Sequence, residues 1–255
     1  MIWRYDELLM NQNDPSWLSE CAAENFLSHF SSALTDREGF IEAMKATHAI
    51  MKFTPACGSQ PATLDIFFGG TMNNADLFQD AMTGIGLNGK AYKSLKTLAG
   101  EIVSLLKKDC FDLKTTGGHS LGGGIAQAFL ARVESQVKLP RSPQCIVLDP
   151  QLLNNKQARS ALKQATRPYS YTAPRGLIID LDYPANPKRS LCDIMKTFGR
   201  YTHPGMVHLK LDLTEEDGAG GPPEKSGLPM MGYHGDNHQY RRAIERFSGF
   251  LSNLN

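Results

Sequence analysis

The chain has 255 residues, 41% of them hydrophobic, which is enough for a sizeable core and excludes a disordered polypeptide. Its 27 lysines and arginines are almost matched by 26 aspartates and glutamates, giving a formal net charge of +1. No basic stripe stands out, so we expect no nucleic-acid partner.

The five cysteines are scattered and form no Cys-x-x-Cys pair: Cys21, Cys57, Cys110, Cys145 and Cys192. This pattern predicts neither a disulfide framework nor a zinc site and favours a reducing compartment. The chain does not open on a basic segment followed by an apolar run, and no apolar stretch is long enough to span a bilayer. We therefore expect a cytoplasmic protein, or one exported without a classical signal peptide.

The first fifty residues have the pattern of helices. Asp14-Pro15 is a cap with proline at the first helical position, and apolar residues follow at helical spacing. The segment 35–38 has the form of a capping box, and Phe40, Met44 and Met51 follow it at helical spacing. We interpret residues 1–60 as an N-terminal helical extension packed on the main domain.

The rest of the chain alternates between strand and helix patterns. Short apolar or alternating runs predict strands at 63–68, 111–117, 145–148, 177–179 and 207–213. Helical spacing predicts helices over 91–108, over 125–133 and from about residue 237. The alternation predicts an α/β fold, a mostly parallel sheet with helices on both faces. Without an internal repeat or linker, we expect residues 1–255 to form one domain, with 218–227 as a surface loop.

A Gly-x-Ser-x-Gly segment lies between one predicted strand and the helix after it. In Gly118-His119-Ser120-Leu121-Gly122 the serine would occupy a sharp strand-to-helix turn that exposes its hydroxyl group. Only very small residues fit two positions before and after such a serine, and both positions are glycine. This setting predicts that Ser120 is a nucleophile rather than a capping residue.

The motif and its surroundings resemble the class 3 lipases, which are α/β-hydrolases acting on lipid esters. Phe68-Gly69-Gly70-Thr71 resembles their oxyanion segment, although Gly69 replaces the usual arginine. Asp76-Leu77 and Asp80 follow at matching spacing, with Leu77 in place of a tryptophan. Three downstream segments follow in the family's order: Asp182-Tyr183-Pro184, Tyr201-Thr202-His203-Pro204-Gly205 and Asn237-His238-Gln239-Tyr240. The resemblance covers roughly residues 60 to 245 and implies an α/β-hydrolase fold.

The resemblance implies an oxyanion hole made of the backbone N–H groups of Thr71 and Leu121. It also places the lid of these lipases at residues 72–82, where Leu77, Phe78 and Met82 would form an apolar side. Two interpretations of that segment stay open: a lid that opens at a lipid surface, or an ordinary short helix. A lid would bring transient contact with a membrane surface.

A serine hydroxyl needs a base, and histidine is the usual one. Four of the seven histidines are poorly placed, because they lie in the N-terminal helices, beside the serine or within a strand: His29, His48, His119 and His208. That leaves His203, His234 and His238. The resemblance gives the catalytic role to His238 and makes His203 structural, and a histidine on a late loop also suits the order of the α/β-hydrolase triad.

The triad acid orients that histidine, and three aspartates compete for the role. Asp182 follows the strand at 177–179, and the resemblance points to it. Asp180 lies two residues earlier on the same strand. Asp149 ends the preceding strand and stays the alternative acid, because some α/β-hydrolases place the acid there.

These residues predict a serine hydrolase of lipid esters, of lipase or phospholipase A type, that works through Ser120, His238 and Asp182 and an acyl-enzyme intermediate. It would need no cofactor or metal; His234, Asp236 and His238 offer too few ligands at a typical spacing. The missing signal peptide would equally suit a bacterial effector or toxin that attacks membrane lipids. Alternative functions are a non-catalytic lipase-like binding module, and an acyltransferase or thioesterase using the same triad. The sequence leaves the oligomeric state open.

Overall fold

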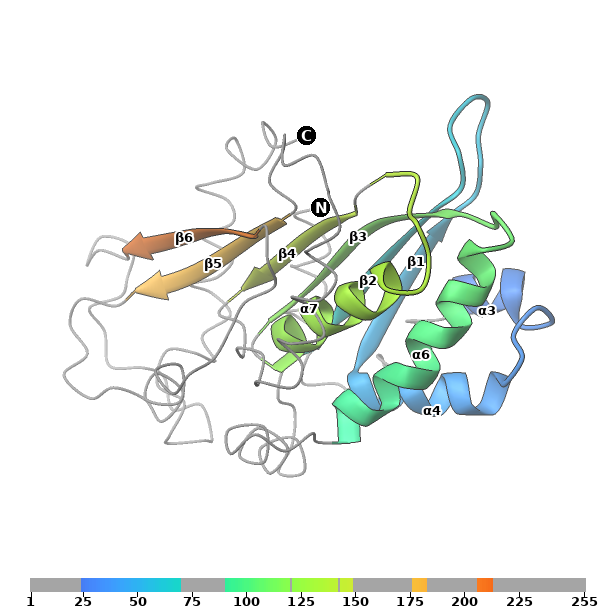
Figure 1. The fold of residues 1–255 in the computed structure, drawn as a ribbon, viewed down its shortest axis with the longest axis horizontal. Helices are drawn as coiled ribbons and strands as arrows, with labels where there is room; N and C mark the ends of the chain where they lie inside the picture. Colours follow the sequence, from blue (N-terminus) through green and yellow to red (C-terminus); the bar gives the residue numbers. More distant parts are fainter. Residues whose placement is uncertain are drawn as a thin grey trace.

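The computed structural model describes residues 24–69, 90–119, 121–141, 143–148, 176–182 and 206–212. Their strands form one sheet in the order β1-β2-β3-β4-β5-β6 (Figure 1). The strands span Ala49–Thr54, Thr63–Phe68, Asp112–His119, Gln144–Leu148, Gly176–Asp182 and Met206–Asp212. Strand β1 pairs antiparallel with β2, and every later pair is parallel. The sheet is therefore mostly parallel, as predicted.

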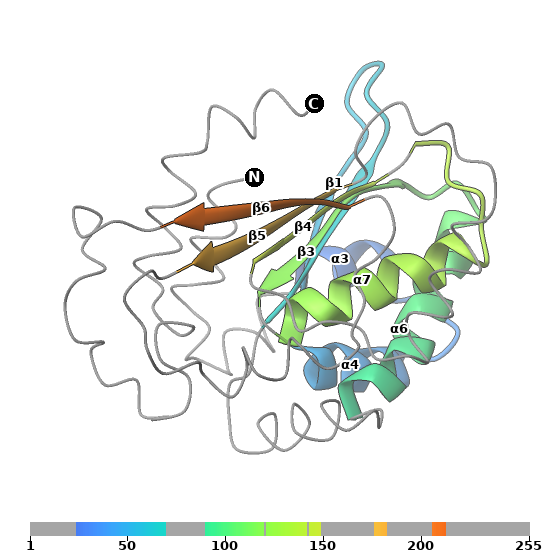
Figure 2. The same ribbon diagram turned by 60° about the vertical axis from the view of Figure 1, so that its left-hand side comes forward.

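The described helices are α3 (Glu24–Phe30), α4 (Arg37–Thr47), α6 (Lys90–Leu106) and α7 (Leu121–Glu134). Helix α6 packs between α4 and α7, and α7 lies on β2, β3 and β4 (Figure 2). These three helices therefore share one face of the sheet. Helices on the other face stay a prediction, because the described residues place none there.

One core fills the space between this helix layer and the sheet. Leu64, Ile66 and Phe68 alternate along β2 and are fully buried against the helices. Helix α6 contributes Leu98 and Ile102 to the same core. The central helix α7 is buried along almost its whole length, from Leu121 to Glu134. Its first residues are therefore fixed by packing from several sides.

The start of the described chain corrects the sequence prediction at two places. The N-cap of α4 is Asp36, one residue later than the predicted capping box implies, and its carboxylate accepts the N–H of Gly39 at 2.8 Å. The predicted placement of Met51 in a helix is wrong. Helix α4 ends at Thr47, His48 adopts a left-handed conformation (φ 49°), and Met51 lies in strand β1. Part of the segment interpreted as a helical extension is thus the edge of the sheet.

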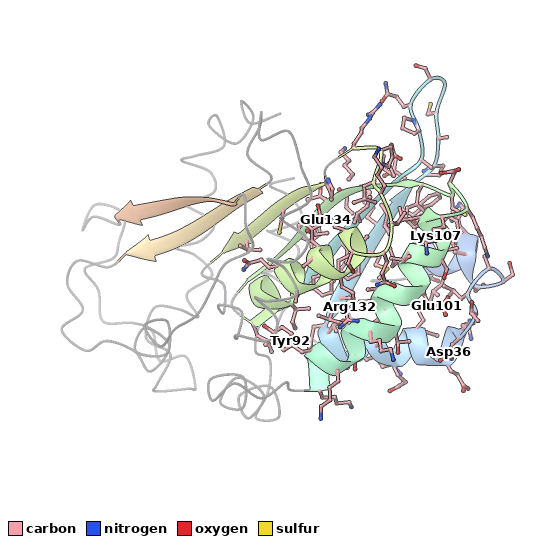
Figure 3. All side chains as sticks on the ribbon, in the orientation of Figure 1. Asp36, Tyr92, Glu101, Lys107, Arg132 and Glu134 are labelled. Atoms are coloured by element: carbon pink, nitrogen blue, oxygen red, sulfur yellow. The ribbon has the colours of Figure 1, made fainter. Side chains whose placement is uncertain are left out.

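The loop between α3 and α4 is tied to α6 by a buried carboxylate. The Glu101 oxygens accept the backbone N–H groups of Thr35 at 2.9 Å and Asp36 at 3.0 Å. Figure 3 labels Glu101 on α6 and Asp36 just before the start of α4. Because Asp36 in turn caps α4, Glu101 holds the beginning of that helix against α6.

Candidate active site

Strands β2 to β6 all end at one side of the sheet, which we call the carboxyl edge. Its last strand residues are Phe68, His119, Leu148, Asp182 and Asp212. Functional groups in parallel α/β sheets are presented at this edge. Strand β3 ends at His119 and α7 begins at Leu121, so a single residue, Ser120, connects them at the carboxyl edge. The strand-to-helix setting predicted for the serine is present, although Ser120 itself lies outside the described residues.

The two glycines around this turn are in close contact with backbone atoms. A β-carbon on Gly118 would stand 2.8 Å from the carbonyl oxygen of Phe68 and 2.5 Å from the carbonyl carbon of Gly122. A β-carbon on Gly122 would collide with the carbonyl oxygens of Phe68 and Gly69. Because the obstacles are backbone atoms, no side chain can turn aside to make room. The close approach explains why the sequence has glycine at both positions.

This contact brings together two segments that are about fifty residues apart in the sequence. Phe68 and Gly69 begin the predicted oxyanion segment, and Gly118 and Gly122 flank the predicted nucleophile. The register agrees, because Phe68 is the partner of Gly118 in the β2–β3 ladder. Thr71, two residues beyond Gly69, lies outside the described residues. The approach of the Phe68 carbonyl group to Gly122 is a feature that sequence reasoning missed.

The end of β2 is also held from its other side. The N–H group of Gly69 donates to the carbonyl oxygen of His48 at 3.0 Å. His48 is the left-handed residue between α4 and β1, and its own N–H group bonds back to α4. The chain leaving β2 is therefore fixed between β1 and the start of α7.

The amino end of α7 can supply hydrogen-bond donors at the carboxyl edge. The first four N–H groups of any α-helix have no acceptor within the helix and carry the positive end of its dipole. In α7 these groups belong to residues 121–124, and the first turn carries no acidic side chain that would neutralise them. Leu121, one of the two predicted oxyanion donors, is the first residue of the helix.

Two of the candidate acids, Asp180 and Asp182, lie toward the carboxyl end of β5, two strands away from β3. His119, Leu148 and Ile179 share one row of the sheet across β3, β4 and β5. Ser120, Asp149 and Asp180 each follow a residue of that row, whereas Asp182 is two residues further and ends β5. Asp149 lies outside the described residues. Strand β5 is longer than the three residues predicted, and both Asp180 and Asp182 belong to it.

The structure places a further aspartate, Asp212, at this edge. Asp212 ends β6 and is the register partner of Asp182. The alternation of apolar residues along 207–213 already placed it in a strand. The pairing across two strands could not be predicted, because it depends on the register of β5 and β6.

The candidate bases His203, His234 and His238 lie outside the described residues. The chain that carries His234 and His238 leaves β6 at the carboxyl edge, the edge at which Ser120 lies. Three other histidines are accounted for by the secondary structure. His29 lies in α3, where its Nδ1 is 2.8 Å from the carbonyl oxygen of Asn25; His48 is the C-cap residue after α4; and His208 lies within β6.

Several other expectations fall outside the described residues as well: the lid segment 72–82, the loop 218–227, the C-terminal helix and the metal ligands considered at 234–238. Within the described ranges, no group of three or more metal-ligating side chains comes together. No described helix is both long enough and apolar enough to cross a membrane.

Comparisons with known proteins leave the family open. No family model matches the chain, and no curated protein matches it. One similar solved structure is a fungal lipase–inhibitor complex presented as a model for interfacial activation in lipases. It is 13% identical with a TM-score of 0.32, over 67% of this chain and 71% of that one. Another is a mutant esterase, 11% identical with a TM-score of 0.34, over 94% of this chain and 98% of that one. Likeness at these scores is too low to assign the fold or the activity.

Proposed function

We propose that the protein is a serine ester hydrolase with Ser120 as its nucleophile. The observation that carries this proposal is the close approach of Phe68 and Gly69 to Gly122 at the carboxyl edge of the sheet. This crowded turn restricts the sequence, since no side chain fits at Gly118 or Gly122. Such a turn is typical of sites where a serine hydroxyl group must project from a sheet beside backbone N–H donors.

In the proposed reaction, the Ser120 hydroxyl oxygen attacks the ester carbonyl carbon while His238 takes the hydroxyl proton. The N–H groups of Thr71 and Leu121 stabilise the negative oxygen of the tetrahedral intermediate. His238 then donates the proton to the leaving alcohol, and Ser120 keeps the acyl group. Water, activated by His238, attacks this acyl-enzyme and releases the acid. Asp182 orients His238 and stabilises its charged form.

The narrower proposal is that the substrate is a lipid ester, as for a lipase or a phospholipase A. It rests on the resemblance of residues 68–80 to the oxyanion and lid segments of class 3 lipases. The contact of Phe68 and Gly69 with Gly122 supports this, because it brings the beginning of that segment to the nucleophile turn.

A fluorophosphonate probe, which reacts with activated serines, tests the proposal. We expect the wild-type chain to be labelled and the Ser120→Ala variant not to be. A folded wild-type chain that is not labelled would instead favour a non-catalytic binding module. Turnover of esters with increasing acyl length, and of phospholipids, would then separate an esterase from a lipase and a phospholipase. Transfer of the acyl group to an added alcohol rather than to water would identify an acyltransferase.

A further inference from the structure

Helix α6 exposes three lysines on its first two turns. Lys90, Lys93 and Lys96 are exposed, whereas Tyr92 and Leu95 between them are buried in the core. The spacing of three residues places each lysine beside the next along the helix surface. We call these three residues the α6 lysines. They form a positive surface on a chain whose net charge is only +1.

The α6 lysines lie near the carboxyl edge of the sheet. Helix α6 connects β2 to β3, two parallel neighbours, so it runs back across the sheet from the end of one strand to the start of the other. Its amino end is therefore on the side where β2 ends and α7 begins, as Figure 1 shows. The other end of the helix, with the exposed Lys107 and Lys108 just beyond it, is on the opposite side.

These lysines are unfavourable for the helix that carries them. Cations at a helix amino end oppose the helix dipole, and like charges three residues apart repel each other. Two of the three lysines lie in the first turn, which contains no acidic residue. The stability of α6 therefore does not explain this pattern of lysines. Binding of an external partner of opposite charge would explain it.

Neighbouring charges within the described part of the chain do not neutralise the α6 lysines. On α4, which packs against α6, Glu42 is paired with Lys45 at 3.0 Å, and Glu38 lies in the first turn of the helix. The one acidic residue of α6 itself is Glu101, which is buried and bound to the α3–α4 loop. On α7, the charged residues Arg132 and Glu134 lie at the far end of the helix.

We propose that the α6 lysines dock the protein on an anionic lipid bilayer and so bring the carboxyl edge to its substrate. This inference rests on the proposed function, because it takes the substrate to be a lipid ester held in a bilayer. The lysines stand on the outer surface of a helix, a shape that suits a flat charged surface. Attraction of lysines to anionic lipids acts within about one Debye length and weakens as salt is added.

The test measures binding by co-sedimentation with vesicles, using the full chain with Ser120→Ala so that no lipid is hydrolysed. The vesicles contain either phosphatidylcholine alone or an equimolar mixture with phosphatidylserine. We expect binding to the mixed vesicles only, and weaker binding at high salt. The combined Lys90→Gln, Lys93→Gln and Lys96→Gln variant should lose about a hundredfold in affinity. Because the assay needs no turnover, its result stands even if Ser120 proves not to be the nucleophile.

The control replaces Lys107 and Lys108, just beyond the opposite end of α6, by glutamine. It removes two positive charges where the test variant removes three, and it should bind like the parent chain. The variant without the α6 lysines should unfold at the same or a higher temperature, because it loses cations at the amino end of a helix. Measuring that temperature distinguishes weak binding from misfolding. Equal losses in both variants would overturn the proposal, because any positive charge would then serve. So would unchanged binding without the α6 lysines, or equal binding to the two kinds of vesicle. Absence of binding to both kinds would also overturn it.

Discussion

Phe68 and Gly118 are partners on neighbouring parallel strands, and the Phe68 carbonyl oxygen lies 2.8 Å from where a β-carbon on Gly118 would stand. The same carbonyl group lies against Gly122 at the start of α7. One carbonyl oxygen thus restricts both glycines of the Gly-x-Ser-x-Gly segment. The position of the turn is set by the end of β2, a part of the chain remote in sequence from Ser120.

This restriction predicts the effect of a single methyl group at the turn. Gly122→Ala should lower the free energy of unfolding by about 3 kcal/mol, because the methyl group can be accommodated only if the backbone of β2 or α7 moves. Such a movement would displace Ser120, and we expect turnover of an ester to fall at least about a hundredfold. Chemical denaturation and ester hydrolysis measure the two effects. Unchanged activity in a stable Gly122→Ala protein would contradict the proposed geometry.

Gly100 offers a matched control within a neighbouring helix. It lies inside α6, and apart from the adjoining backbone of that helix a β-carbon there would have no heavy atom within 4 Å. Gly100→Ala should therefore raise the free energy of unfolding by about 0.5–1 kcal/mol, since alanine restricts the unfolded chain more than glycine does. Ester turnover should not change. The opposite signs at Gly100 and Gly122 separate a general effect of alanine from the crowding at the turn.

Local patterns in the sequence were sufficient where one segment decides its own structure. The apolar run that ends at Gly69-Gly70 predicted β2 with its observed bounds, Thr63–Phe68. The helical spacing of 91–108 predicted α6, which spans Lys90–Leu106. Each of these segments has one period and a clear stop, so that no distant partner is needed to identify it.

Strand β1 was missed because its apolar residues also fit the end of a helix. Met51 continues the spacing of Phe40 and Met44, and the break between α4 and β1 lies at His48. The left-handed residue that ends a helix is usually glycine, so a histidine at that position does not indicate the end of α4 in the sequence. The strand is decided by its pairing with β2, which no local pattern contains.

The candidate site was only partly predictable for a similar reason. The strand-to-helix turn around Ser120 could be predicted from its immediate neighbours, since the glycines and the two flanking elements are local. The order of Asp182 before Asp149 rested on the resemblance and on their positions after predicted strands, because no local pattern contains the sheet register that relates these aspartates to Ser120. The register of β5 with β6 added Asp212, which the sequence alone did not suggest.

The buried carboxylate of Glu101 predicts that Glu101→Gln and Glu42→Gln will differ in their effect on the free energy of unfolding. Glu101→Gln should lower the free energy of unfolding by about 1.5–3 kcal/mol, because an amide group offers one acceptor oxygen to the two N–H groups of Thr35 and Asp36. Thermal or chemical unfolding measures this loss. Hydrogen exchange at the start of α4 should also become faster, because Asp36 caps that helix.

Glu42 provides the comparison for Glu101. Its carboxylate is paired with Lys45 at 3.0 Å, but both side chains are more than half exposed, at 68% and 52%. Water screens such a pair, and Glu42→Gln should change the free energy of unfolding by less than about 0.5 kcal/mol. Equal losses from the two substitutions would show that Glu101 does not hold the α3–α4 loop.

The thiols of Cys57 and Cys145 should react very differently with an alkylating reagent. Cys57 is exposed, whereas burial raises the pKa of the Cys145 thiol from 9.0 to about 12, with the Glu134 carboxylate adding to the shift. The reactive thiolate is therefore almost absent from Cys145 in the folded protein. Iodoacetamide at pH 8 should modify Cys57 and spare Cys145 until denaturant is added, as peptide mass mapping would show. Rapid modification of Cys145 in the folded chain would contradict its burial.

The same pKa predicts how Cys145 affects stability at alkaline pH. The thiol ionises near 9.0 in the unfolded chain and at about 12 in the folded one. Its contribution is therefore fully present below pH 9 and is lost as the pH rises toward 12, because the unfolded state releases its proton first. The free energy of unfolding should fall more steeply over this range in the wild-type chain than in Cys145→Ala. Parallel curves for the two proteins would show that the thiol is not perturbed.

The catalytic assignments are tested by two comparisons, His238 with His203 and Asp182 with Asp149. His238→Ala should abolish ester turnover, whereas His203→Ala should mainly lower the free energy of unfolding.

Asp182→Asn should reduce turnover about 10⁴-fold, because an amide favours the wrong tautomer of the histidine and cannot stabilise its charged form. Asp149→Asn should have a far smaller effect. Asp149 follows β4, the neighbour of β3, and Asp182 ends β5, one strand further, so the two substitutions are matched in chemistry and lie at the same edge of the sheet. A larger loss in Asp149→Asn would transfer the role of the acid to β4, and full activity in His238→Ala would require another base.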